Sequence, residues 1–130
     1  KYPQSDSISA CNNLMDELRI NLSNKSFANA KQYYTTENYR AAIIALDNVL
    51  IDYPSIKNRE EIYFIILESS YFLAINSILF KKEDRLYKTI ESYKQFIDNY
   101  PKSIFDNSVK EIYSNTLKTI EELKLTKNEI

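Results

Sequence analysis

The sequence contains no glycine, no histidine and no tryptophan, and its 130 residues include one cysteine and three prolines. Without glycine, the chain cannot form the glycine-rich loops that hold phosphate groups in nucleotide-binding proteins. Without histidine, and with Cys11 as its one cysteine, it cannot assemble a Cys/His zinc site, a Ser-His-Asp triad or a Cys-His nucleophile pair. We therefore expect a protein that is not an enzyme and that needs no metal or other cofactor.

Basic and acidic residues are nearly balanced, with 17 Lys and Arg against 18 Asp and Glu. Nucleic-acid-binding domains usually carry a clustered basic excess, so no nucleic-acid partner is expected. Hydrophobic residues make up 44% of the sequence, which is enough for the core of a folded domain. The longest apolar run, residues 62–80, is interrupted by serine, asparagine and glutamate and is too polar to span a membrane.

The spacing of the apolar residues predicts an all-α fold. These residues recur three and four positions apart, and each proline that follows a tyrosine ends a helix. The first helix carries one apolar stripe of Ile8, Cys11, Met15, Leu18 and Leu22, which Phe27, Ala30 and Tyr33 continue. We expect helices over residues 7–35, 39–52, 58–79, 86–99 and 106–123, with a capping box of Asn58 and Glu61 and an exposed charged turn at 81–85.

The dipeptide Tyr-Pro recurs roughly every 50 residues, at 2–3, 53–54 and 100–101. A repeat of this period is typical of α-solenoids, in which helical hairpins stack and each supplies the core of its neighbour. We expect one domain over residues 1–130, in a first unit (1–54), a second unit (55–101) and a terminal capping helix with its tail (102–130). We also expect this domain to be part of a longer chain.

The first unit resembles a tetratricopeptide repeat. The order and spacing of small, aromatic, large and proline positions in that family match Ala30, Tyr33, Tyr39, Ala42, Leu46, Val49 and Pro54. The second unit keeps this register in Leu86, Thr89, Tyr93, Phe96 and Pro101. Its first helix is about two turns too long if Ser70 is the small packing residue.

A closer resemblance is to the BamD family, and it covers essentially the whole chain. It is carried by the three Tyr-Pro turns, the extended first helix and the segments Ala30–Tyr34, Tyr39–Ile43, Arg59–Glu61 and Ser69–Tyr71. The chain is similar to the carboxy-terminal half of versions from the Bacteroidetes group. The resemblance implies a lipoprotein of the β-barrel assembly machinery at the periplasmic face of the outer membrane, attached to the membrane only through a lipid anchor absent from this sequence.

The same resemblance implies a non-catalytic scaffold with protein partners. The expected partner is the barrel-inserting subunit, bound through its POTRA region, and other assembly lipoproteins are further candidates. Two alternatives remain open. A general peptide-binding adaptor would use a groove with Lys25, Asn29 and Gln32, and a glycan-binding outer-membrane lipoprotein would belong to a much larger chain.

A candidate docking site lies on the second helix, away from its expected packing face. This 41–51 stripe consists of Ala41, Ile44, Ala45, Asn48 and Ile51, whereas the equivalent positions one repeat later are Lys88, Glu91, Ser92, Gln95 and Asp98. A surface facing water should resemble the second set. We expect the stripe to bind a partner, although the long first helix could instead fold back over it.

A second candidate is the basic cluster of Lys81, Lys82, Arg85 and Lys88, which is interleaved with Glu83 and Asp84. A solvated turn explains it most simply, and a protein or anionic-lipid contact is the alternative. Cys11 and five tyrosines are expected to be structural: Cys11, Tyr33, Tyr39 and Tyr93 in the packed interior, and Tyr53 and Tyr100 against the turns.

Overall fold

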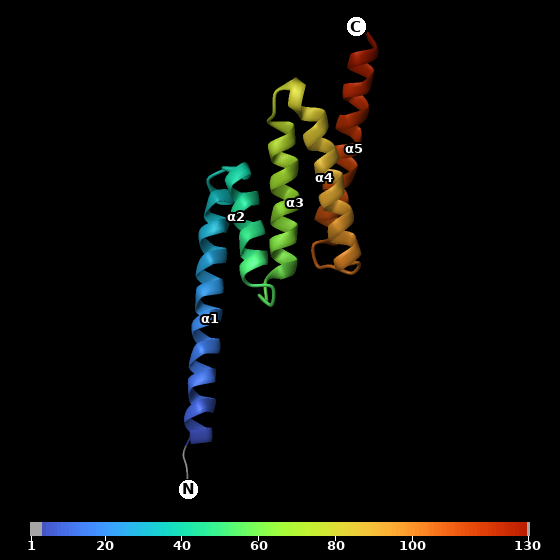
Figure 1. Cartoon of the computed structure of the whole chain (residues 1–130). Coiled ribbons are helices and arrows are strands. Elements are labelled where there is room, and N and C mark those ends of the chain that lie inside the picture. The colour runs from blue at the N-terminus through green and yellow to red at the C-terminus, as the bar shows by residue number, and fades with distance from the viewer. Residues whose placement is uncertain (1–3, 130) are drawn as a thin grey trace.

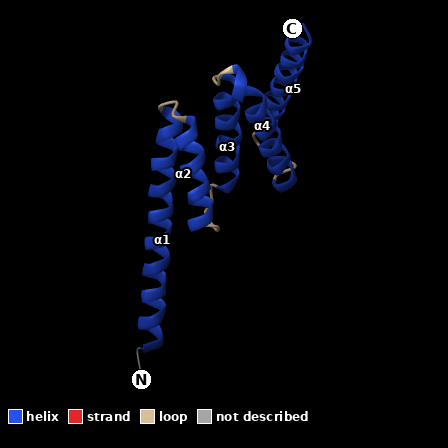
Figure 2. Cartoon of the chain, turned by 45° about the horizontal axis from the view of Figure 1, so that its top comes forward, coloured by secondary structure: helices blue, strands red, loops and turns tan. Residues whose placement is uncertain are grey.

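A computed structural model describes the backbone of residues 4–129 and the side chains of residues 7–126. Five helices follow one another along the chain: α1 (Gln4–Thr35), α2 (Tyr39–Asp52), α3 (Arg59–Ile75), α4 (Leu79–Asn99) and α5 (Asp106–Glu129) (Figure 1). No strand occurs within these described residues (Figure 2). The predicted all-α fold is therefore confirmed.

The helices are stacked as successive antiparallel hairpins. α2 packs between α1 and α3, and α4 packs against α3 and α5 (Figure 1). Less extensive contacts join α1 to α3 and α3 to α5. This is the tetratricopeptide-like arrangement that the repeat predicted, with α1–α2 and α3–α4 as hairpins and α5 as the final helix.

Each interface between helices has its own hydrophobic core. The first joins α1, α2 and α3 around Phe27, Leu46 and Ile62. The second joins α3, α4 and α5 around Leu67, Phe96 and Val109. Because α3 contributes to both, neither hairpin buries its apolar face alone, as expected for stacked repeats.

The two Tyr-Pro turns inside the fold have nearly the same conformation. Tyr53 has φ −130° and ψ 69°, and Tyr100 has φ −136° and ψ 69°. In each case the tyrosine N–H donates to the carbonyl four residues earlier, on Val49 or Phe96. The following proline excludes a further helical residue, so α2 and α4 end where the sequence predicted. Both tyrosines were expected to have a structural role at these turns, and both pack against the hydrophobic cores.

The turn between α3 and α4 differs from the prediction. α3 ends at Ile75 and α4 begins at Leu79, so the charged residues 81–85 lie within α4 and not in a turn. The Ser77 hydroxyl donates to the Leu73 carbonyl at 2.5 Å and accepts from Arg85 Nη1 at 2.6 Å, which holds the turn in place. The extra length of the second unit therefore belongs to α4, with 21 residues against 14 in α2.

Two local expectations around α3 are also wrong. Ser69 and Ala74 are fully buried small residues of this helix, whereas Ser70 is only partly buried. The capping box is absent, because the Asn58 side chain makes no capping hydrogen bond. Glu61 instead accepts from Lys31 Nζ at 2.8 Å, so it joins α3 to α1.

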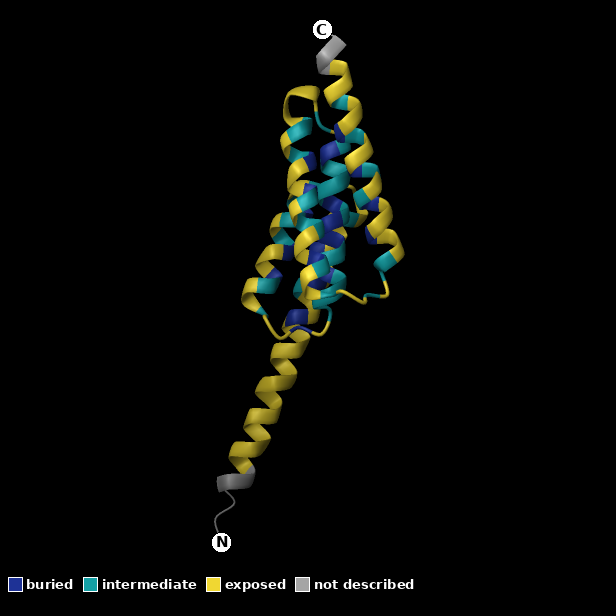
Figure 3. Ribbon diagram, turned by 90° about the vertical axis from the view of Figure 1, so that its right-hand side faces the viewer, coloured by how far each residue is buried: buried dark blue, intermediate teal, exposed yellow. Residues whose placement is uncertain are grey.

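The first half of α1 projects beyond the hairpins, and its residues 7–22 are all exposed (Figure 3). Cys11 is therefore exposed, and its expected packing role is wrong. The buried residues of α1 are Ser23, Phe27 and Ala30, and the stripe from Ile8 to Leu22 lies roughly 100° around the helix from them. The stripe therefore does not continue into the core between α1 and α2.

The prediction that Tyr33, on the second half of α1, lies in the packed interior is also wrong. It is 45% exposed, and the neighbouring Tyr34 packs on the core instead. Tyr39 and Tyr93 are partly buried, in agreement with the repeat pattern. Tyr39 contacts the ring of Phe72 at 5.3 Å between centroids, and Tyr93 stacks on Tyr113 of α5 at 4.1 Å.

Candidate docking surface

The 41–51 stripe is open to solvent. α2 buries Ala42, Leu46 and Val49, so the stripe lies on the remaining surface of the helix. Ile44 is 57% exposed and Ile51 is 74% exposed, and Asn48 is exposed between them. Ala41 is partly buried. Ala45 is partly buried at the edge of the first core, so it marks the boundary of the exposed surface.

The long first helix does not cover this stripe. α1 continues straight past the end of α2 and does not fold back over it (Figure 1). The exposure of Ile44 and Ile51 agrees with this course. Intramolecular cover by α1, the alternative explanation for the apolar stripe, is therefore wrong for this chain.

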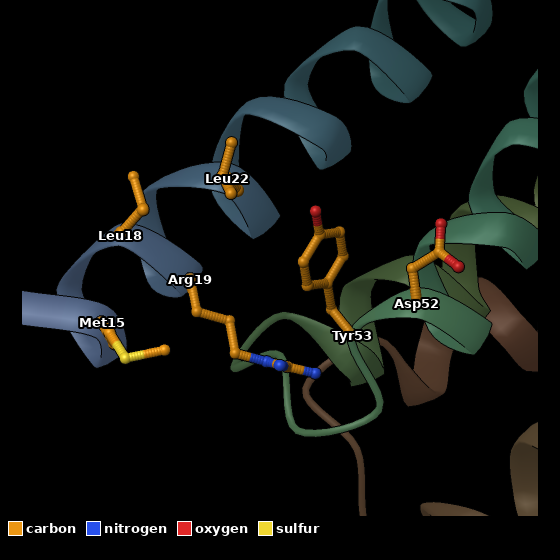
Figure 4. Close-up of a pocket in the computed structure, with 6 residues that line it drawn as sticks. All are labelled: Met15, Leu18, Arg19, Leu22, Asp52 and Tyr53. Carbon is orange, nitrogen blue, oxygen red and sulfur yellow. The ribbon is translucent and has the colours of Figure 1, made fainter. Parts of the chain in front are cut away.

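An open pocket adjoins the end of the stripe. It has a volume of about 350 Å³ and lies between α1 and the carboxy-terminal end of α2 (Figure 4). α1 contributes Met15, Leu18, Arg19 and Leu22, and the other wall is formed by Asp52 and Tyr53. Asp52 directly follows Ile51 in α2, so the pocket lies next to the end of the 41–51 stripe and opens toward apolar residues of α1.

A second pocket lies beside the first and shares Arg19 and Tyr53 with it. Its volume is about 460 Å³, and it is bounded by α1 and the turn of residues 53–57. Arg19 and Lys57 supply positive charge, and Asp16 supplies negative charge. The pair of pockets thus offers apolar walls with charged groups of both signs, which suits a protein segment better than a small ion.

The surface one repeat later has the opposite character. Lys88, Glu91, Gln95 and Asp98 are exposed on α4, and Ser92 is partly buried. The contrast that the sequence indicated between the two second helices is therefore present on the surface of the fold. It provides a natural internal control for experiments on the 41–51 stripe.

The basic cluster lies on the first turns of α4 and does not form one uniform site. Arg85 is bound to Ser77 and stabilises the α3–α4 turn. Lys81 and Lys88 are exposed, and Lys82 is partly buried. Sequence reasoning missed three exposed apolar residues just before the cluster, Ile78, Leu79 and Phe80. The prediction placed Ile78 and Leu79 inside the third helix, where apolar residues are expected to be buried. Recognising their exposure required knowing that a new helix begins at residue 79.

The side chains whose pKa is raised lie away from both pockets. Burial is the main cause of the raised pKa of Tyr34, Tyr39 and Tyr71. The negative charge of Glu68 raises the pKa of Tyr34 and Tyr39 further. Desolvation raises the pKa of Asp47 on α2. None of these groups lines either pocket. The groups with a raised pKa are therefore separate from the candidate docking surface.

The residues considered for peptide binding lie along α1. Lys25, Asn29 and Gln32 are all exposed there. Between residues 7 and 126, His, Cys, Asp and Glu side chains form no group that could hold a metal ion. Within the same part of the chain, none of the helices combines the length and the hydropathy needed to cross a membrane.

The family model YfiO, described as an outer membrane lipoprotein, matches residues 22–122. The match covers both helical hairpins from the base of the projecting helix and most of α5. No curated protein matches the chain significantly. The YfiO family is the BamD-like family that the sequence resemblance indicated. The chain belongs to the YfiO family of outer membrane lipoproteins.

Proposed function

We propose that this chain is a non-catalytic scaffold of the outer-membrane β-barrel assembly machinery and that it binds the POTRA region of the barrel-inserting subunit. Membership of an outer membrane lipoprotein family supports the proposed location at the outer membrane. We further propose that it corresponds to the carboxy-terminal half of a Bacteroidetes-like BamD. In this proposal, a lipid anchor outside the chain holds it at the periplasmic face of the membrane, and other assembly lipoproteins are further partners.

The single observation that supports a docking role most directly is the exposure of the 41–51 stripe. Ile44 and Ile51 leave most of their surface in water, although both neighbouring helices of α2 are in place. Apolar side chains that remain exposed on one repeat, where the next repeat is polar, are typical of a protein interface. The adjoining pocket would receive a side chain of the partner beside Tyr53.

The test is the double variant Ile44→Asp with Ile51→Asp, assayed by co-purification with the POTRA region. Full burial of an Ile side chain contributes about 1.5–3 kcal/mol, and both residues are more than half exposed in the free chain. We therefore expect the affinity to fall by roughly thirtyfold or more. The melting temperature should remain unchanged, because neither residue belongs to the core.

The matched control is Glu91→Lys with Asp98→Lys, at equivalent positions of α4. Both residues are exposed in the free chain, and we expect the control to bind the POTRA region nearly as well as the unmodified protein. If the isoleucine variant folds and still binds normally, the 41–51 stripe is not the docking site. In that case Lys81, Lys82 and Lys88 become the surface to examine next.

A further inference from the structure

The α3–α4 turn presents three large apolar side chains to solvent. Ile78 is 69% exposed, Leu79 is 64% exposed and Phe80 is 87% exposed. They are consecutive, and they form the tip of the second hairpin, at the opposite end from the two Tyr-Pro turns (Figure 1). The core of the hairpin lies behind them, around Ala74, Leu86 and Ile120, and does not use them. The fold therefore does not explain this apolar tip.

Hydrogen bonds connect the residues at the base of the tip. The Ser77 hydroxyl donates to Leu73 on α3 and accepts from Arg85 on α4, so it links both helices just below the tip. The Ile78 carbonyl accepts from the N–H groups of Lys81 and Lys82, each at 3.0 Å. A preorganised tip loses little conformational entropy when it enters a binding partner.

Two lysines directly follow the apolar tip, at a place in α4 where positive charge is unfavourable in the isolated chain. Lys81 and Lys82 lie in the first turn of α4, where the helix dipole disfavours cations, and this turn contains no acidic residue. Ile78 occupies the capping position without a side-chain hydrogen bond. Residues 81–88 carry four basic and two acidic side chains, so the positive sign prevails there. An anionic surface at the tip would offset these unfavourable terms.

We propose that this tip, Ile78–Lys82, inserts into the surface of an anionic phospholipid bilayer. Leu79 and Phe80 enter the boundary between headgroups and acyl chains, and Lys81 and Lys82 contact the phosphates. Short apolar segments flanked by lysine bind membranes in this manner, through burial and charge together. The family's place at the outer membrane brings a bilayer within reach. A bilayer suits this tip because it offers an apolar layer for Leu79 and Phe80 and anionic headgroups for the adjacent Lys81 and Lys82.

The contact is weak and reversible by itself. Stable membrane attachment requires two strong signals, such as two lipid chains or one lipid chain with a polybasic patch. One short apolar segment with two lysines binds a membrane more weakly than that. Its effect is to orient a protein that is already held at the membrane. This inference concerns a different surface from the 41–51 stripe and does not depend on it, so either proposal can fail alone.

The absence of tryptophan permits a direct test. In the variant Phe80→Trp, the single indole reports on the tip, and in Ile104→Trp it reports on the α4–α5 turn, where Ile104 is 88% exposed. The probe is vesicles of phosphatidylglycerol and phosphatidylethanolamine. We expect the indole emission of the tip variant to shift to the blue and to be quenched by brominated lipid, and that of the α4–α5 turn variant to remain unchanged. Identical emission spectra of the tip variant with and without vesicles would overturn the proposal.

Charge variants test the anionic specificity in a vesicle flotation assay. Lys81→Gln with Lys82→Gln should weaken partitioning by about fivefold per lysine, and Leu79→Ser with Phe80→Ser by at least about tenfold. Asp84→Asn should strengthen it severalfold, because Asp84 is exposed one turn below the tip. Equal binding to phosphatidylcholine vesicles, or no effect of these changes, would overturn the proposal. Leu14→Ser with Leu18→Ser on α1 is the control for general apolar adhesion, and a loss as large as that of the tip variant would also overturn it.

Discussion

The hydroxyl of Tyr34 on α1 donates a hydrogen bond to the carboxylate of Glu68 on α3. One turn earlier on α1, Lys31 Nζ lies 2.8 Å from Glu61 Oε2, also on α3. Both contacts join the first helices of the two units. Tyr34 and Glu68 are partly buried, whereas the Lys31 side chain is 47% exposed, so the Tyr34 bond should contribute more to the stacking of the units.

Tyr34→Phe removes the hydroxyl and leaves the Glu68 carboxylate without this donor. We expect the free energy of unfolding to fall by about 1–2 kcal/mol, because the bond involves a charged, partly buried group. Lys31→Ala should cost less than about 1 kcal/mol, because exposed ion pairs contribute little. Urea unfolding of both variants measures the difference, and a larger loss for Lys31→Ala would contradict this ranking.

The same tyrosine predicts a loss of stability at high pH. Burial, together with the hydrogen bond and negative charge of Glu68, raises the pKa of Tyr34 in the folded state. The unfolded chain releases the proton near pH 10, the ordinary value for tyrosine. The stability that Tyr34 contributes is therefore complete below about pH 10 and is lost as the pH rises toward the folded pKa. The stability difference between the unmodified protein and Tyr34→Phe should shrink between about pH 9 and 11 in urea titrations. A constant difference would show that the two states release this proton at the same pH.

Ala42→Glu should be far more damaging than Ala41→Glu. Ala42 has no exposed surface, so a carboxylate there must lose its water, at a cost of several kcal/mol. Ala41 is partly buried at the start of the 41–51 stripe, where a longer side chain can reach solvent. Thermal unfolding followed by circular dichroism compares the two variants. Similar melting temperatures would mean that the register of α2 in solution differs from this structure.

Ser69 offers a stabilising substitution. Its hydroxyl is fully buried and has no hydrogen-bond partner among the described residues. Ser69→Ala removes this unpaired polar group, and we expect stability to rise by about 1 kcal/mol. The contrast is Thr116→Val, because Thr116 is equally buried but donates to the Ile112 carbonyl at 2.7 Å. That change should lower stability by a similar amount, and a loss in both variants would indicate that Ser69 Oγ is hydrogen-bonded in solution.

Cys11 should react with a thiol reagent in the native protein. It is exposed on the projecting half of α1, so no unfolding is needed for access. We expect labelling with a chromogenic disulfide reagent to proceed at nearly the same rate with and without denaturant. Strong protection in the native protein would mean that another molecule covers this half of α1 in solution.

Short-range chemistry made much of the fold predictable. The Tyr-Pro pairs end α2 and α4 within the chain itself, since the proline ring excludes a further helical residue whatever its surroundings. The spacing of Ala42, Leu46 and Val49 likewise identified the buried face of α2, and so left the 41–51 stripe as its exposed side. The end of α3 was not predictable in this way, because no proline or glycine marks it.

The sequence by itself determined an all-α repeat of hairpins, because helical periodicity and proline act over a few residues. Tertiary structure decided where α3 ends, since the contact of Ser77 with Arg85 forms only when α3 and α4 are paired. It also decided that Phe27 is buried while Leu18, on the same helix, is 59% exposed. Both are apolar residues in a helical pattern, and the pattern records that a face is apolar but not whether another helix lies against it. Burial depends on the length of the neighbouring α2, which ends at Asp52, and no other described helix packs over residues 7–22 of α1.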